Sequence, residues 1–214
     1  MIPFLPLATR LLPGISVPDT PLITGSIALA QDKLPESLFN HVMRSRLIGQ
    51  ASINRLPAAN RSVVDEEAHG VAAILHDLGF AFNTTIISPD RLFELVWDAI
   101  ALHTQADITK FKEPLVAYTS SGTLAEIVGQ DIANYQFGGP VINVSKTEWD
   151  AIYEAYPKKK FRTQFFDTVS YLCKTKPATT YNNFLVGVGD RFTPGYNKTR
   201  KLTVDLLDAL LTDE

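Results

Sequence analysis

The chain has 214 residues, of which 45% are hydrophobic and 20% are charged, and its formal net charge is −3. This length and this proportion of hydrophobic to charged residues suit one soluble domain with a buried core. A mildly acidic chain lacks the positive surface that nucleic-acid binding requires. The apolar opening, residues 1–7, is interrupted by prolines and followed by Arg10, so it is too short to span a bilayer. We therefore expect no nucleic-acid partner and no membrane partner.

The single cysteine, Cys173, excludes an internal disulfide bond. It lies in an apolar helical stretch without an activating partner, which argues against a nucleophilic role. The only basic run, Lys158 to Lys160, follows Pro157 and is predicted to be solvated surface. These features are typical of a cytoplasmic protein, which is the location we expect.

Apolar residues at helical spacing, usually opened by a capping residue or a proline, predict eight helices. In chain order these helices begin near Thr20, Pro35, Ser62, Ser88, Pro114, Ser145, Phe161 and Asn197. Ser62 with Asp65 and Ser145 with Glu148 have capping-box spacing, and Gly79 is a natural helix end.

Strand signals are few, so the sequence predicts an all-α fold. Residues 177–194 are predicted to be irregular and to pack across the bundle. We expect an N-terminal extension over residues 1–16 and one domain over residues 17–214, which contains the irregular segment and a final helix.

The four histidines are the main candidates for chemistry: His41, His69, His76 and His103. A lone histidine on an apolar helix is more often a hydrogen-bonded core residue than a ligand. The dipeptide His76-Asp77 changes this balance, because imidazole nitrogen and carboxylate oxygen both bind divalent ions. Adjacent helical residues point about 100° apart. One ion can therefore take both side chains only near the edge of a buried face.

Several short sequence motifs resemble those of the HD superfamily of metalloproteins, in its cyanamide hydratase-like branch. They are Phe-Asn-His-Val-Met-Arg-Ser at 39–45, Leu-His-Asp-Leu-Gly at 75–79 and Ala-Leu-His-Thr at 101–104, with Pro-Asp-Thr-Pro at 18–21 and Ala-Tyr-Pro-Lys-Lys at 155–159. The resemblance extends over about residues 17–196. It implies that the domain is a single HD-domain helical bundle.

The resemblance also implies a divalent metal ion, zinc or alternatively iron(II), held by His41, His76, Asp77 and a fourth acidic residue. The family's fourth ligand is usually an aspartate three residues before a glycine, which matches Glu126 ahead of Gly129. Asp131 is the rival for this position. It lies roughly 140° around a helix from Glu126.

Two further residues acquire catalytic roles from the resemblance. His103 matches the branch's additional downstream histidine and is expected to hydrogen-bond the nucleophile or shuttle a proton. Glu94 lies in a Phe-Glu motif and is expected to line the pocket. An equally good interpretation is that Glu94 is an exposed carboxylate on a helix surface. Phe80, Phe82 and Trp97 are expected to keep that pocket small and dry, which favours a small neutral substrate.

The function implied is a metal-dependent hydro-lyase, a hydratase that adds water to a small nitrile such as cyanamide and gives urea. An HD-type phosphohydrolase acting on a nucleotide is the alternative, with Arg44, Arg46, Arg55 and Arg91 available to bind phosphate. A shortened HD protein without catalytic activity is the third reading. Its support is the spacing of only 26 positions between Asp77 and His103, which is shorter than in the branch. The sequence does not exclude that the chain forms a homo-oligomer.

Overall fold

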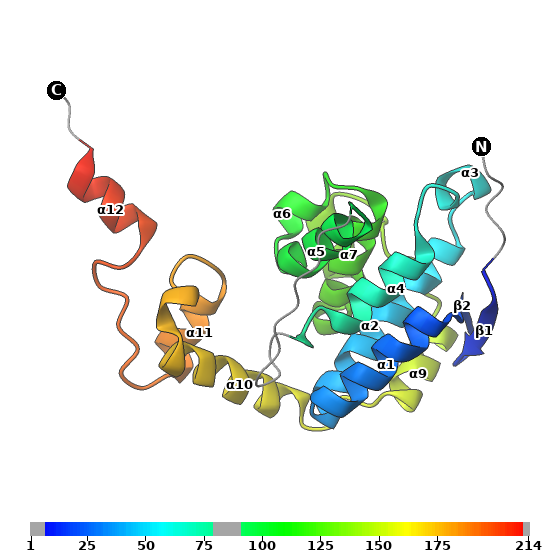
Figure 1. Cartoon of the computed structure of the whole chain (residues 1–214), viewed down its shortest axis with the longest axis horizontal. Coiled ribbons are helices and arrows are strands. Elements are labelled where there is room, and N and C mark those ends of the chain that lie inside the picture. The colour runs from blue at the N-terminus through cyan, green and yellow to red at the C-terminus, as the bar shows by residue number, and fades with distance from the viewer. Residues whose placement is uncertain (1–6, 79–90, 212–214) are drawn as a thin grey trace. The chain divides into compact units, whose positions relative to one another are not determined.

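The computed structural model of the chain describes residues 7–78 and 91–211, with side chains of the second range described from residue 94. This described part is all-α, as predicted, apart from one two-stranded antiparallel hairpin (Figure 1). Its elements are β1 (Thr9–Leu12), β2 (Ile15–Pro18), α1 (Pro21–Lys33), α2 (Glu36–Asn54), α3 (Ala58–Arg61), α4 (Glu66–Leu75), α5 (Arg91–Leu102), α6 (Ala106–Thr109), α7 (Pro114–Val128), α8 (Gln130–Phe137), α9 (Lys146–Ala155), α10 (Phe161–Thr175), the short 3₁₀ helix η2 (Pro177–Thr179), α11 (Leu185–Phe192) and α12 (Thr203–Leu210). None of the helices in the described ranges is both long and apolar enough to cross a membrane.

The chain divides into two compact units, Met1–Lys159 and Lys160–Glu214. The first contains the hairpin and helices α1 to α9, and the second contains α10, η2, α11 and α12. Sequence patterns indicated one domain over residues 17–214 and gave no boundary at Lys160. Strand β2 also places Ile15 in the core of the first unit, so the packed chain begins before residue 17.

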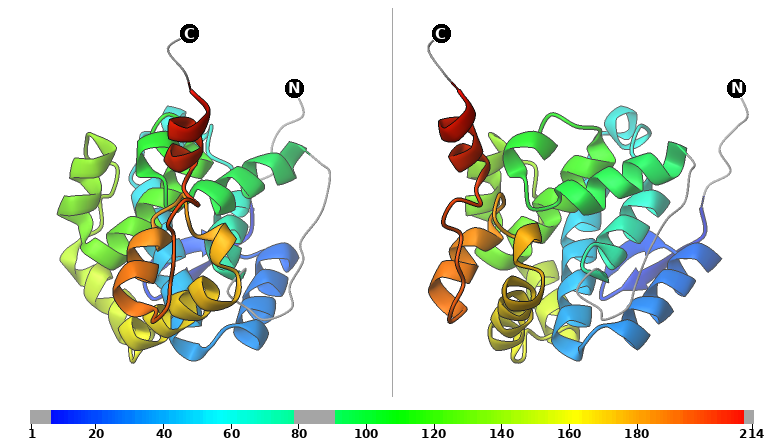
Figure 2. Two further views of the ribbon diagram at one scale, coloured as in Figure 1. Left: turned by 90° about the vertical axis from the view of Figure 1, so that its left-hand side faces the viewer. Right: turned by 60° about the vertical axis from the view of Figure 1, so that its left-hand side comes forward.

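Helix α2 is the centre of the first unit. It contacts α1, α4, α7, α9 and β2, and the two views in Figure 2 show it among these elements. Residues along almost its whole length are buried, polar ones included. A helix surrounded on all sides buries every face rather than a single apolar stripe. The core cluster around it consists of Ile15, Val17, Leu47, Ile48, Ala51, Ala125, Ala133, Ile142, Val144 and Ile152.

Two glycines allow α2 to approach its neighbours closely. A Cβ atom built on Gly122 of α7 would lie 2.7 Å from the backbone carbonyl oxygen of Ser45 on α2. A Cβ atom built on Gly49 of α2 would lie 2.7 Å from the His69 ring on α4. Both distances are shorter than real Cβ contacts, so a larger residue at either position would force the neighbouring atoms to shift. The packing brings together three helices that carry or precede candidate site residues.

The predicted helix caps are partly confirmed. Thr20 caps α1 by accepting a hydrogen bond from Ile23 N at 3.3 Å, and Ser145 with Glu148 forms the predicted capping box of α9. The predicted cap at Ser62 is wrong. Asp65 caps α4 instead, accepting from Ala68 N at 2.9 Å. Ser62 ends the short helix α3, which precludes its starting the next one.

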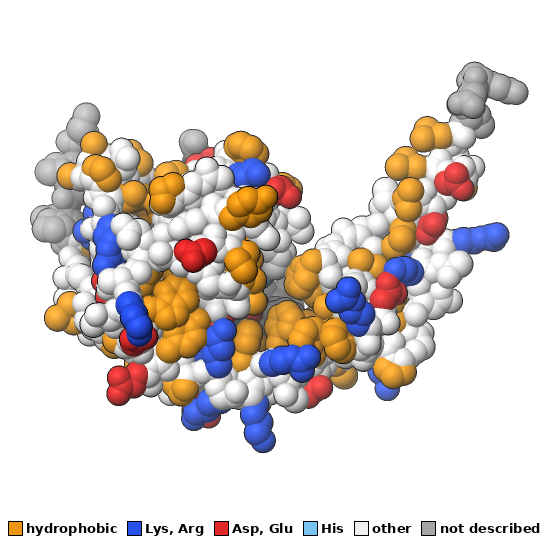
Figure 3. Space-filling view, turned by 180° about the vertical axis from the view of Figure 1, so that it is seen from behind, with side chains coloured by type: hydrophobic (Ala, Val, Ile, Leu, Met, Phe, Trp, Pro, Cys, Tyr) orange, Lys and Arg blue, Asp and Glu red, His pale blue; other side chains and the backbone are white. Residues whose placement is uncertain are grey.

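The second unit differs from the prediction in two places. Helix α11 lies within residues 177–194, which were predicted to be irregular. The last helix begins at Thr203 rather than near Asn197, because the Asn197 side chain accepts a hydrogen bond from Thr199 N at 2.9 Å and forms a local turn. Apolar side chains of α12 remain exposed, among them Leu206 and Leu210 (Figure 3). The predicted helix start at Ser88 and helix end at Gly79 lie outside the described residues.

Candidate metal centre

The candidate ligands come from the ends and middles of different helices in the first unit. His41 is buried in the middle of α2, and Glu126 is buried near the end of α7. Helix α4 ends at Leu75, so His76 caps it and Asp77 lies in the turn that follows. The sequence placed this pair inside the helix. His76 itself keeps right-handed helical backbone angles, so the pair continues directly from the end of α4.

The three residues His41, His76 and Asp77 converge on one point. The two Nε2 atoms are 3.2 Å apart, and Asp77 Oδ2 lies 3.5 Å from each of them. Zinc binds such atoms at about 2.0–2.2 Å in a tetrahedron, which separates ligand atoms by about 3.3 Å. All three side chains are buried. Among the described residues, they form a group that could hold a metal ion.

Hydrogen bonds on the far sides of both imidazoles direct their lone pairs to this point. His76 Nδ1 lies 2.9 Å from the Ala73 carbonyl oxygen. A carbonyl only accepts, so Nδ1 is the donor, and Nε2 of the neutral ring carries the lone pair. His41 Nδ1 lies 2.5 Å from a Glu126 carboxylate oxygen, so this nitrogen donates and Nε2 is the atom turned toward the shared point. The donor set and its outer hydrogen bonds therefore fit a divalent metal ion.

Burial shifts the pKa values of His76 and Asp77 in the directions that disfavour their charged forms. Burial, and then the charge of His41, lowers the pKa of His76 to about 3. Burial also raises the pKa of Asp77 above its usual range, against the opposing charges of His41 and His103. His76 is consequently a neutral imidazole at pH 7, which is the form that binds metal.

Glu126 lies beside the ligand group but not within it. Its Oε2 contacts Nδ1 of His41, and its Oε1 accepts from Nε of Arg44 at 2.7 Å. Burial alone would raise the pKa of Glu126, but the hydrogen bond from His41 and the charges of His41, Arg44 and Lys158 outweigh it and lower the pKa to about 2. Glu126, the predicted fourth ligand, is thus an ionised carboxylate that contacts Nδ1 of His41, the ring nitrogen that faces away from the other candidate ligands. Asp131, the rival, is exposed in the first turn of α8.

Three residues contact Glu126 in a way that the sequence did not predict. Arg44 donates to Glu126 and, through Nη1, to the Tyr156 carbonyl at 2.8 Å. Tyr153 Oη and Lys158 Nζ donate to the Glu126 carbonyl oxygen at 2.8 and 3.1 Å. Arg44 follows His41 by three positions, so helical spacing alone could have placed it on the same face. Lys158 was predicted to be solvated surface, and its contact depends on the chain turn after α9.

His103 lies at the edge of the group, directly after α5. Its Nδ1 donates to the Ile100 carbonyl at 2.7 Å, so Nε2 of the neutral ring carries a lone pair. That Nε2 atom is 3.8 Å from Asp77 Oδ1, and the ring lies 4.7 Å from the His76 ring, centroid to centroid. Burial, and then the charge of His76, lowers the pKa of His103 to about 4. Its side chain is 16% exposed, which gives this base access to solvent.

Other predicted residues are not brought to the group. Glu94 is exposed on α5, and Trp97 is 65% exposed, so neither encloses the three ligands. Phe80 and Phe82 lie outside the described residues. His69 is buried elsewhere on α4, where its Nδ1 lies 3.3 Å from the Thr119 hydroxyl. It is a core histidine.

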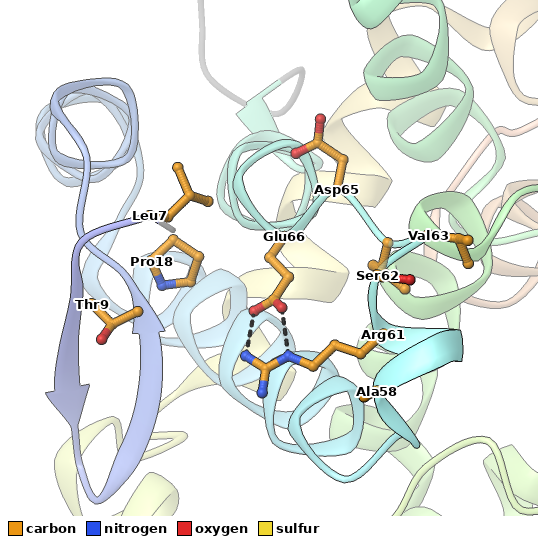
Figure 4. Close-up of a pocket in the computed structure, with 10 residues that line it drawn as sticks. Leu7, Thr9, Pro18, Ala58, Arg61, Ser62, Val63, Asp65 and Glu66 are labelled. Atoms are coloured by element: carbon orange, nitrogen blue, oxygen red, sulfur yellow. Dashed lines mark hydrogen bonds and ion pairs between the residues drawn. The ribbon is translucent and has the colours of Figure 1, made fainter. Parts of the chain in front are cut away.

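A cavity of about 730 Å³ lies between the hairpin, α3 and the start of α4 (Figure 4). Arg61 and Glu66 line it and contact each other directly, with Nε–Oε1 and Nη2–Oε2 distances of 2.6 and 2.9 Å. Their charges satisfy each other in a bidentate pair. None of the predicted site residues lines this cavity.

Comparisons of the chain with protein-family models, with curated proteins and with solved structures gave no match.

Proposed function

We propose that this protein is an HD-type metalloenzyme that adds water to a small nitrile such as cyanamide, giving urea. The observation that carries the proposal is the triangle of His41 Nε2, His76 Nε2 and Asp77 Oδ2, with sides of 3.2, 3.5 and 3.5 Å. Those residues occur in the order that the HD-like motifs predict, and His103 lies beside them. Two nitrogens and one oxygen suit zinc or iron(II).

A divalent ion at this point would supply a Lewis acid for the nitrile nitrogen and would lower the pKa of a bound water. The chain's own residues supply the remaining steps. Glu126, held by Arg44, accepts from Nδ1 of His41 and so turns His41 Nε2 toward the shared point. His103 Nε2 is a base of the right tautomer to take a proton from the attacking water and return it to nitrogen. The water oxygen bonds to the nitrile carbon as one C–N π bond is lost, and a proton reaches the nitrogen, which gives an imidic acid. Transfer of the remaining O–H proton to the nitrogen then replaces the second C–N π bond with the C=O bond of urea.

The arginines that a phosphohydrolase would need are directed elsewhere. Arg44 binds Glu126, Arg46 is fully buried and donates to the Pro18 carbonyl at 3.1 Å, and Arg55 pairs with Glu148. The Arg91 side chain lies outside the described residues. The three of these arginines whose side chains are described thus make their recorded contacts away from the three ligands. This arrangement favours a neutral substrate.

The test is urea formation from cyanamide by the purified chain, supplied separately with zinc and with iron(II). Phosphate release from nucleoside mono-, di- and triphosphates is measured in parallel, and His76→Ala is the control. We expect metal-dependent urea formation that His76→Ala abolishes. Phosphate release without urea would replace the hydratase with the phosphohydrolase. Neither product from a metal-loaded chain would indicate a shortened HD protein without catalytic activity.

A further inference from the structure

The chain segment that carries His103 lies between two helices that both pack on α7. Helix α5 ends at Leu102, so His103 is the first residue beyond it, and α6 begins at Ala106. Helices α5, α6 and α7 contact one another (Figure 1). Carbonyl groups at the end of a helix have no amide partner within that helix and need a donor from elsewhere. The carbonyl of His103 is in this position.

A serine of α7 supplies the donor. The Ser120 hydroxyl donates to the His103 carbonyl oxygen at 2.7 Å, and its oxygen lies 2.9 Å from the Thr109 hydroxyl. A hydroxyl has one proton and a carbonyl oxygen only accepts, so the Ser120 proton goes to His103 and Thr109 donates to Ser120. Both hydroxyl residues are fully buried. Two hydrogen bonds thus connect the end of α6, through α7, to the backbone of His103.

This hydrogen bond of Ser120 differs from those of its neighbours on α7. Thr119 and Thr123 each donate to the carbonyl four residues earlier in the same helix, at 2.9 Å. Helical hydroxyls commonly form this local bond. Ser120 instead donates to a segment 17 positions away. Ser121 is equally buried, and its hydroxyl has no hydrogen-bond partner among the described residues. The contact with His103 is therefore particular to Ser120.

The backbone around His103 determines where its imidazole lies. Nδ1 of the ring donates to the Ile100 carbonyl at 2.7 Å, which ties the ring to the end of α5. Nε2 of the same ring lies 3.8 Å from Asp77 Oδ1, at the edge of the candidate metal centre. Misplacement of a reacting group by about 1 Å can lower the rate by about 10²-fold. A hydrogen bond that fixes this backbone therefore affects the base itself.

We propose that Ser120, supported by Thr109, is a positioning residue for His103. Its hydroxyl holds the chain that follows α5 against α7, so that Nε2 of His103 stays beside Asp77. Ser120 acts on the backbone of the base and not on the three metal ligands. This inference rests on the proposed hydratase function, in which His103 transfers a proton.

Steady-state kinetics of the metal-loaded full chain with cyanamide test the proposal. Ser120→Ala should lower kcat by about tenfold, a part of the whole contribution of a general base. KM and metal content should stay near those of the wild type, because the ion and its ligands are unchanged. Ser121→Ala is the matched control. It removes a buried hydroxyl without a partner from the next position and should leave kcat unchanged.

Two substitutions of Thr109 test the second hydrogen bond. Thr109→Val removes the hydroxyl and nearly preserves the shape of the side chain, so kcat should fall in the same direction as in Ser120→Ala. Thr109→Ser restores the hydroxyl and should recover the turnover that Thr109→Val loses. If Thr109 acted only by packing, valine would be the better replacement, and that order of activities would exclude its role in supporting Ser120.

A double-mutant cycle separates positioning from a general structural effect. The base is absent in His103→Ala, so adding Ser120→Ala to this variant should cause no further fall in kcat. Thermal unfolding verifies that each variant is folded. An equal fall in kcat with and without His103, or a wild-type kcat in Ser120→Ala, would overturn the proposal.

The position of His103 can also be measured without turnover. Diethylpyrocarbonate modifies accessible imidazoles, and the His103 side chain is 16% exposed, whereas those of His41 and His76 are buried. Peptide mass spectrometry of the metal-free chain should show faster modification of His103 in Ser120→Ala than in the wild type or Ser121→Ala. Equal rates in the two serine variants would contradict the proposal. A wild type that forms no urea but shows this difference would reject the hydratase function and retain the positioning of His103 by Ser120.

Discussion

Each imidazole of the candidate metal centre is oriented by a hydrogen bond on the side away from the shared point. The Ala73 carbonyl orients His76, and the Glu126 carboxylate orients His41. Such outer partners set the tautomer and raise the basicity of the ligand nitrogen. The ligand geometry therefore depends on residues that do not touch the metal position, and these residues make separate predictions.

The first prediction concerns Glu126→Gln, which keeps the size of the side chain and removes its charge. We expect metal affinity to fall by about 10–100-fold, the usual effect of an outer hydrogen-bond partner, measured by competition with a chelator. The exposed Asp131 provides the control, because Asp131→Asn should leave affinity unchanged. If Glu126→Gln loses metal as completely as His76→Ala, Glu126 is a ligand itself.

The second prediction concerns His103→Ala. The side chain lies 3.8 Å from Asp77 and outside the group of three, so its loss should leave metal content near that of the wild type. Loss of a general base should slow urea formation by about 10²–10⁴-fold. Metal analysis and the cyanamide assay are performed on the same preparation. Metal loss in this variant would make His103 a ligand, and unchanged turnover would make it a structural residue.

The sequence could locate most of the group but not the role of each member. The dipeptide His76-Asp77 places two metal-binding side chains next to each other in the sequence, and the HD-like motifs indicated His41 and His103. Motif matching chose Glu126 over Asp131, and only Glu126 contacts a ligand. Its contact is with the outer nitrogen of His41, which depends on the distance between α2 and α7. No local pattern encodes that distance.

At the scale of elements, the separation of α2 and α7 is set by Gly122 against the Ser45 carbonyl. Gly122→Ala places a methyl group 2.7 Å from backbone, so we expect a loss of about 1–3 kcal/mol of stability, as overpacking typically costs. Because α2 carries His41 and α7 carries Glu126, metal affinity should fall as well. Urea denaturation and chelator competition measure the two effects.

Gly25 on α1 supplies the matched control, because an added Cβ atom meets nothing within 4 Å. Gly25→Ala should leave metal affinity unchanged and stabilise the helix by about 0.5–1 kcal/mol. Equal stability in wild type and Gly122→Ala would show that the two helices are not fixed by this contact.

Helices that begin with a clear capping residue or proline could be predicted from the sequence, whereas elements that depend on tertiary contacts could not. Thr20-Pro21 and the Ser145–Glu148 box gave the starts of α1 and α9 correctly. The hairpin was missed because each strand has four residues, and the Pro13-Gly14 turn is a weak signal by itself. Helix α11 was missed because its glycines suggested a loop, whereas Gly189 is needed for the approach of Tyr196.

At the scale of the whole molecule, every group assigned to the metal centre belongs to the unit that ends at Lys159. A chain truncated after Lys159 should therefore retain the metal content of the full protein, measured after gel filtration. Loss of metal from a folded truncated chain would show that the second unit is required to form the centre.

We expect His41, His76 and Asp77 to bind one divalent metal ion. Inductively coupled plasma mass spectrometry of the purified chain, supplied with zinc or iron(II) and freed of excess, tests it most directly. We expect close to one ion per chain in the wild type, almost none in His76→Ala, and the wild-type content in folded His69→Gln, which removes a buried histidine outside the group. A wild type that holds no metal, or a His76→Ala variant that holds a full equivalent, would contradict the assignment.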